Sequence, residues 1–120
     1  MKTGVRAVVA YVVGRLISGK ESSSVYDFAA NDYTSLGGHV SPSSVNVFDY
    51  THRCNCSGGG NGRTLILFHY GVGKHVSLKL QADRFSGYDY DSESRFSGVV
   101  RHHLVRIYDS ELRRYFSYSI

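Results

Sequence analysis

The sequence predicts an all-β fold: an antiparallel meander of about six two-strand, 20-residue repeats, closed or curled as a barrel. Three observations predict it. The chain resembles itself every 20 residues, apolar and polar residues alternate within each repeat, and Gly and Ser are frequent while Pro occurs once. A fixed period of this length is typical of repeat architectures, and short alternating segments between turn residues are typical of strands.

Two positions of the repeat recur in one register. The first is acidic or His, with spacings of 22, 20, 20 and 20 residues, and comprises Asp27, Asp49, His69, Asp89 and Asp109. The second is apolar, with a constant spacing of 20 residues, and comprises Leu36, Cys56, Val76, Phe96 and Phe116. Each opens or closes a segment of about five alternating residues. The pattern therefore predicts two strands in each repeat.

The segments between these strands are short and carry turn residues. They include residues 41–44, 61–64, 71–75 and 91–95. Links of four or five residues join antiparallel neighbours, because a parallel crossover needs a dozen or more. We expect residues 7–13 to form a degenerate first strand, which completes six units and one all-β repeat domain over residues 1–120. No helix is expected.

Alternation assigns the faces of the sheet. Val45, Val47 and Asp49 share the face that we expect to form the core, and Phe48 and Tyr50 lie on the other. Closure into a barrel would remove the exposed edges of a long meander. A β-solenoid or prism and a β-sandwich are the alternatives. We also expect aromatic rings from neighbouring strands to cover the strand glycines, which are Gly38, Gly58 and Gly98.

Composition excludes several classes of protein. Charged residues at 20% and hydrophobic residues at 42% indicate a folded, soluble chain. No segment approaches the length of a membrane span, and residues 1–16 make a poor signal peptide, so a cytoplasmic location is slightly favoured. The net charge is +4, but the basic residues look scattered along the chain. That scatter disfavours nucleic acid as a partner.

No catalytic site is expected, and the protein is predicted not to be an enzyme. The recurring Asp is predicted to accept backbone N–H groups where a strand enters a turn. The six His residues lie on different repeats and links, so neither a metal nor another cofactor is expected. Cys54 and Cys56 are too close in sequence for an easy disulfide, and Cys56 occupies an apolar position of the repeat.

The aromatic face is the candidate for function. The favoured interpretation is a second core layer, and the alternative is an exposed surface on which sugar rings stack. The candidate ligand-binding residues are Phe48, Tyr50, Phe68, Tyr70, Tyr88, Tyr90, Tyr108, Asp49, Asp89 and Asp109. The sequence thus predicts a small non-catalytic binding or interaction module that recognises carbohydrate or protein. A self-associating structural subunit is the alternative, and a weak nucleic-acid binder is the second alternative.

The Tyr-Asp pairs at residues 26–27, 88–89 and 108–109 resemble the YD repeats of large bacterial toxin-shell proteins. Those repeats also run near 20 residues. The Gly-Arg-Leu element usual in them has no regular counterpart in this chain, which is also far too short to enclose a cargo. The resemblance is one of repeat architecture, and it assigns no role to any residue.

Overall fold

The computed structural model describes all residues, 1–120, and contains one helix followed by ten strands. The helix is α1 (Thr3–Ser18). The strands are β1 (Ser24–Asp27), β2 (Asp32–Val40), β3 (Ser44–Asp49), β4 (Cys54–Gly60), β5 (Thr64–His69), β6 (Lys74–Gln81), β7 (Arg84–Asp89), β8 (Ser94–Arg101), β9 (Leu104–Asp109) and β10 (Arg114–Ser119).

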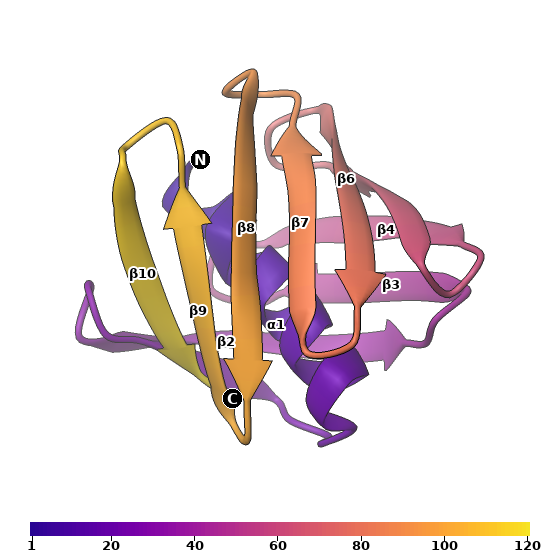
Figure 1. Ribbon diagram of the computed structural model, residues 1–120, viewed down its shortest axis with the longest axis horizontal. Coiled ribbons are helices and arrows are strands. Elements are labelled where there is room, and N and C mark those ends of the chain that lie inside the picture. The colour runs from indigo at the N-terminus through magenta and orange to yellow at the C-terminus, as the bar shows by residue number, and fades with distance from the viewer.

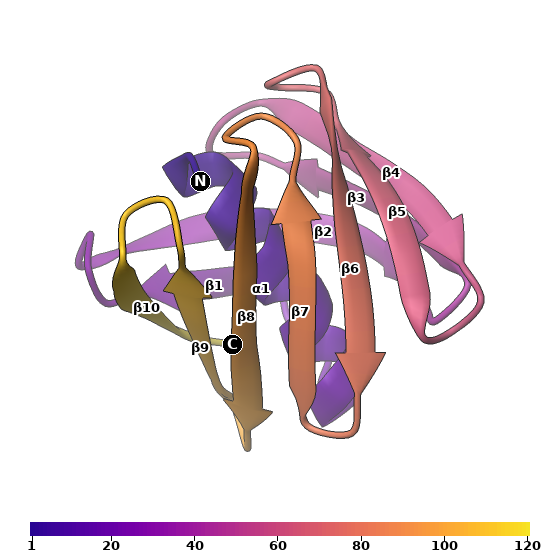
Figure 2. The same cartoon turned by 45° about the horizontal axis from the view of Figure 1, so that its top comes forward.

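Each strand pairs antiparallel with the next along the sequence, and β1 pairs with β10. A single sheet therefore closes into a barrel, with α1 inside it (Figure 1 and Figure 2). The predicted antiparallel meander closed as a barrel is confirmed. The solenoid, prism and sandwich alternatives are wrong.

The N-terminal segment is a helix, so the prediction of a first strand at residues 7–13 is wrong. Its Val and Tyr residues favour strands by propensity. However, every residue from Val5 to Gly14 is buried, and a helix that is apolar on all sides is typical of a protein interior. The interior of a barrel widens with its strand number, and α1 fills the interior of this one. The barrel contains five two-strand units rather than six.

The inner face of the barrel and α1 form one hydrophobic core of 25 buried residues. The predicted aliphatic face is part of it, because Val45 and Val47 of β3 are 2% and 0% exposed. The second repeat position also faces inward, since Cys56, Val76 and Phe96 are all buried. Burial of a Val or Leu side chain contributes roughly 1.5–3 kcal/mol. The period of 20 residues thus marks positions that face the interior of the barrel.

Aromatic rings cover some inward-facing glycines, as predicted for Gly98. The Phe85 ring of β7 and the backbone carbonyl of Arg106 in β9 both occupy the space that a side chain at Gly98 of β8 would need. At Gly38 and Gly58 the same prediction is wrong, because only backbone atoms of the neighbouring strand, and no aromatic ring, occupy that space. The single helix is not long and apolar enough to cross a membrane.

Candidate binding surface

The recurring Asp side chains point into one end of the barrel. Asp27, Asp49, Asp89 and Asp109 are between 0% and 3% exposed. The Asp49 Oδ1 accepts the backbone N–H groups of Thr51 and His52, both at 2.9 Å. Asp27 and Asp109 accept N–H groups two and three residues ahead in the same way. These carboxylates are turn anchors inside the wall, so they cannot contact a ligand on the outer surface.

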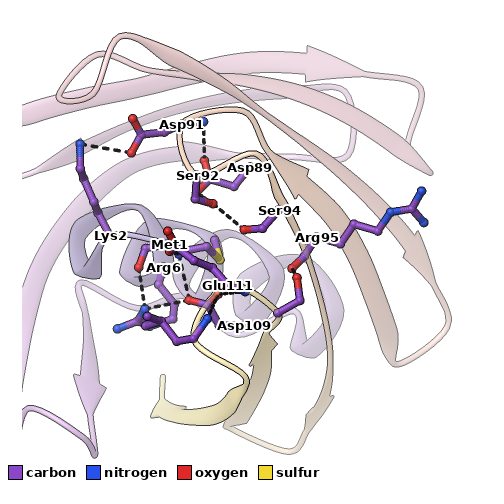
Figure 3. A network of polar contacts seen from close by, with 12 residues as sticks. Met1, Lys2, Arg6, Asp89, Asp91, Ser92, Ser94, Arg95, Asp109 and Glu111 are labelled. Atoms are coloured by element: carbon purple, nitrogen blue, oxygen red, sulfur yellow. Dashed lines mark hydrogen bonds and ion pairs between the residues drawn. The ribbon is translucent and has the colours of Figure 1, made fainter.

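The N-terminal end of α1 lies at this acidic end of the barrel. The Arg6 guanidinium donates to the Asp109 carboxylate at 3.2 Å and to the Tyr118 hydroxyl at 3.0 Å. The amino group of Met1 donates to the same carboxylate at 3.0 Å (Figure 3). The positive end of the helix dipole favours nearby carboxylates. The network therefore fixes the direction in which the helix enters the barrel.

His69 takes the place of Asp in its repeat and is buried without a polar partner. It is 3% exposed, and neither ring nitrogen has a hydrogen-bond partner. Burial lowers the pKa of His69, although the charges of Asp49 and Asp89 oppose that shift. The imidazole is thus held neutral inside the barrel wall.

The two Cys residues are free thiols. Cys56 is paired directly opposite His69 across β4 and β5 and is 2% exposed, which agrees with its apolar repeat position. Burial, followed by the neighbouring Cys54, raises the pKa of Cys56 to about 12. No group of three or more His, Cys, Asp or Glu side chains is placed to hold a metal ion.

The aromatic face lies on the outside of the barrel, so the favoured prediction of a second core layer is wrong. Tyr50, Tyr70 and Tyr90 are 60%, 58% and 50% exposed, and Phe48 is 38% exposed. The other predicted residues, Phe68, Tyr88 and Tyr108, are half-buried. A barrel closed around a helix has only one inner face, and the aliphatic residues occupy it. The aromatic residues must therefore face solvent.

The exposed rings pack against each other in edge-on pairs. Phe48 contacts Tyr50, Phe68 contacts Tyr70, and Tyr88 contacts Tyr90, with ring centroids 5.0, 4.8 and 4.8 Å apart. Tyr108 contacts Tyr115 of β10 at 5.0 Å. Edge-to-face pairs of this kind contribute about 0.5–1.5 kcal/mol beyond area burial. The rings are thereby held in fixed positions on the outer surface.

A groove crosses the outer face of β6 to β10, the strands β6 to β9 forming the near wall of the barrel in Figure 1. It consists of two hollows of about 640 and 430 Å³ that share Lys79, Ser86 and Ser97. We call it the outer groove. Its lining comprises four cationic side chains, three Tyr rings and several hydroxyl groups, and no Asp or Glu. The cations are Lys79, Arg84, Arg95 and Arg106, and the rings are Tyr88, Tyr108 and Tyr115.

Strand register assembles the outer groove from residues that are far apart in sequence. One row across the sheet runs from Lys79 through Ser86, Ser97 and Tyr108 to Tyr115. A second row contains Ser77, Tyr88 and Arg95. A third contains Arg84, Val99 and Arg106. Rows two residues apart along a strand are separated by roughly 6.5–7 Å.

Sequence reasoning placed Tyr88 and Tyr108 in a candidate site but missed the four cations. They occupy different positions of the 20-residue repeat, so the repeat does not group them. The predicted site residues also separate in space: the Asp residues lie inside, whereas the aromatic residues lie outside. Comparison with family models, with curated proteins and with solved structures yields no match.

Proposed function

We propose that this barrel is a non-catalytic binding module and that its ligand lies in the outer groove. One observation carries the proposal: the groove combines fixed aromatic rings, hydroxyl groups and cations that no carboxylate neutralises. A concave surface with a few convergent polar groups is the usual form of a ligand site. The groove crosses five strands, so it suits an extended ligand.

Tyr88 and Tyr108 supply flat apolar surfaces, and Ser77, Ser86 and Ser97 supply hydroxyl groups. A carbohydrate chain would use both, by stacking its rings on Tyr and by hydrogen bonding to Ser. The acidic acceptors that the sequence suggested for sugar hydroxyl groups do not take part, because Asp89 and Asp109 are fully buried. Acidic or sulfated sugars would gain further from the four cations.

Isothermal titration calorimetry against neutral glycans, acidic glycans and oligonucleotides tests the proposal. We expect one of these classes to bind and the Tyr88→Ala variant to bind it at least tenfold more weakly. The matched control is Tyr50→Ala, which removes an exposed ring outside the groove. Equal losses for the two variants, or no binding by any class at high protein concentration, would contradict the proposal.

A second candidate function is self-association through the outer face of β3 and β5. The motivating observation is that Ile66 of β5 is 48% exposed and that Tyr50 and Tyr70, which directly follow β3 and β5, are 60% and 58% exposed. Apolar surface of this kind is typical of contacts between protein chains. Sedimentation velocity over a wide range of concentrations tests it. A strict monomer at the highest concentration excludes this function, and a dimer that Ile66→Ser abolishes supports it.

A further inference from the structure

We propose that the ligand of the outer groove is a single-stranded nucleic acid. This inference rests on the proposed binding function and names the class of its ligand. The groove is lined by Lys79, Arg84, Arg95 and Arg106 and by no acidic residue. All four cations are exposed, and none forms an ion pair.

The acidic residues of this half of the barrel lie elsewhere. Asp89 and Asp109 point into the interior. The others, Asp83, Asp91, Glu93 and Glu111, lie in the turns rather than on the strands. Because side chains alternate between the two faces of each strand, the charged side chains on the outer face of β6 to β9 are all cations. Unneutralised cations near one another repel, and an anionic chain laid across them would relieve that repulsion while releasing its own counterions.

The Tyr rings indicate which anionic chain fits best. Tyr88, Tyr108 and Tyr115 lie among the cations, and the Arg106 guanidinium lies 4.2 Å from the centre of the Tyr115 ring. Proteins that bind single-stranded nucleic acid combine a positive groove for the backbone with aromatic rings on which bases stack. A sulfated glycan could also lay its sugar rings on the Tyr side chains, but a sugar ring has no π-face of its own, whereas every base has one and gains more from stacking.

The groove also indicates how specifically a nucleic acid would be recognised. A duplex is read by a helix or a β-ribbon that enters its major groove, whereas the outer groove is formed by strands within the barrel wall. Among the side chains of the groove, Gln81 is the only amide and no carboxylate is present. Amide and acidic side chains are the usual readers of A and C edges, and stacking on a Tyr ring accepts every base because each base has a π-face. We therefore expect binding with little preference for base sequence.

Fluorescence anisotropy with labelled DNA and RNA oligonucleotides about 12 nucleotides long tests the inference. Four cations that contact phosphates give a slope of about −3 for the logarithm of the binding constant against the logarithm of salt concentration. Arg106→Ala should weaken binding and reduce that slope by about 0.7. Tyr108→Ala should weaken binding by about 5- to 150-fold and leave the slope unchanged.

The charge-matched control is Arg53→Asn. Arg53 lies in the exposed turn between β3 and β4, with a positive φ of 55° that Asn tolerates, and it does not line the groove. We expect this variant to bind like the wild type, and circular dichroism melts confirm that each variant is folded. If Arg53→Asn weakens binding as much as Arg106→Ala, the attraction is non-specific and the inference fails.

The remaining outcomes separate the inference from the proposed function. Binding of acidic or neutral glycans without binding of either oligonucleotide overturns the nucleic-acid inference and leaves the binding function intact. Absence of binding by every class overturns both. Binding of the oligonucleotides with the predicted slope and the predicted Tyr108→Ala loss supports both, and comparison of the DNA and RNA affinities shows which backbone is preferred.

Discussion

At the scale of single residues, Asp49 shows why an acid recurs in the repeat. Its carboxylate holds two backbone N–H groups of the following turn, and its Oδ2 lies 2.6 Å from the His52 Nδ1. Replacement by Ala removes the acceptor of these part-buried groups. We expect Asp49→Ala to lower the free energy of unfolding by about 1–3 kcal/mol, measured by urea denaturation.

The conservative variant separates the turn contacts from the charge. Asp49→Asn keeps an acceptor oxygen for the N–H groups of Thr51 and His52, so it should lose less stability than Asp49→Ala. Equal losses for the two variants would show that the charge, rather than the turn anchor, is what stabilises this hairpin. The corresponding pair of variants at Asp27, which accepts the backbone N–H groups of Ala29 and Ala30, provides an independent repeat of the experiment.

His69 makes stability depend on pH. Burial lowers its pKa below the ordinary value of 6.5, so the unfolded chain binds a proton more readily than the folded protein does. Protonation therefore favours unfolding, and the His69 contribution should be lost as pH falls below about 6.5. Thermal melts at several pH values check this: His69→Asn should lose less stability between pH 7.5 and 5.5 than the wild type. Identical pH dependence would contradict the prediction.

At the scale of elements, the strands were predictable and the helix was not. Two positions that each recur about every 20 residues locate all five hairpins. They do so because each hairpin must present similar inward-facing residues to one core. Residues 7–13 match the repeat only as a degenerate copy, and their Val residues favour a strand by propensity. Their helical state depends on the barrel that surrounds them. The residues of this segment alone therefore do not predict the helix.

The fit of α1 in the barrel depends on small residues. A Cβ atom at Gly14 would lie 2.8 Å from the Cδ1 of Ile120 and 3.2 Å from a methyl of Val105. A large side chain there must displace both neighbours. We expect Gly14→Leu to lower stability by about 1–3 kcal/mol, which is typical of overpacking, as measured by urea denaturation.

Gly4 in the first turn of α1 is the control. A Cβ atom there would meet only the His52 ring, at an ordinary contact distance of 3.6 Å. Ala is a better helix former than Gly by up to about 1 kcal/mol, so Gly4→Ala should be neutral or stabilising. A similar loss for both variants would show that the helix responds to added volume anywhere rather than to the contact at Gly14.

The residues of the outer groove were predictable only in part. Tyr88 and Tyr108 share a repeat position and were predicted together. Lys79, Arg84 and Arg106 do not share a position of the repeat, and only the pairing of four strands brings them to one groove. Register of this kind depends on the tilt of the closed sheet, which the repeat pattern alone does not specify. The basic residues therefore looked scattered in the sequence and are gathered in the fold.

At the scale of the whole molecule, the barrel closes through its shortest pairing. β1 and β10 share two paired positions, Tyr26 with Ser119 and Asp27 with Tyr118, whereas β9 and β10 share six. Fewer ladder hydrogen bonds make this seam the easiest place to open. Because α1 leads directly into β1, opening the seam would also expose the helix that fills the interior.

Hydrogen exchange measured by mass spectrometry should therefore find the fastest strand exchange in β1 and β10 and the slowest in β6 to β8. A cross-link provides the decisive control. Tyr26 and Ser119 are directly paired, at a Cα separation of about 4.5–5.5 Å that suits a disulfide. In the Tyr26→Cys/Ser119→Cys variant, oxidation should slow exchange in β1, β10 and α1 together, and reduction should restore it. If α1 still exchanges at the wild-type rate when the seam is locked, the helix becomes exposed by another route.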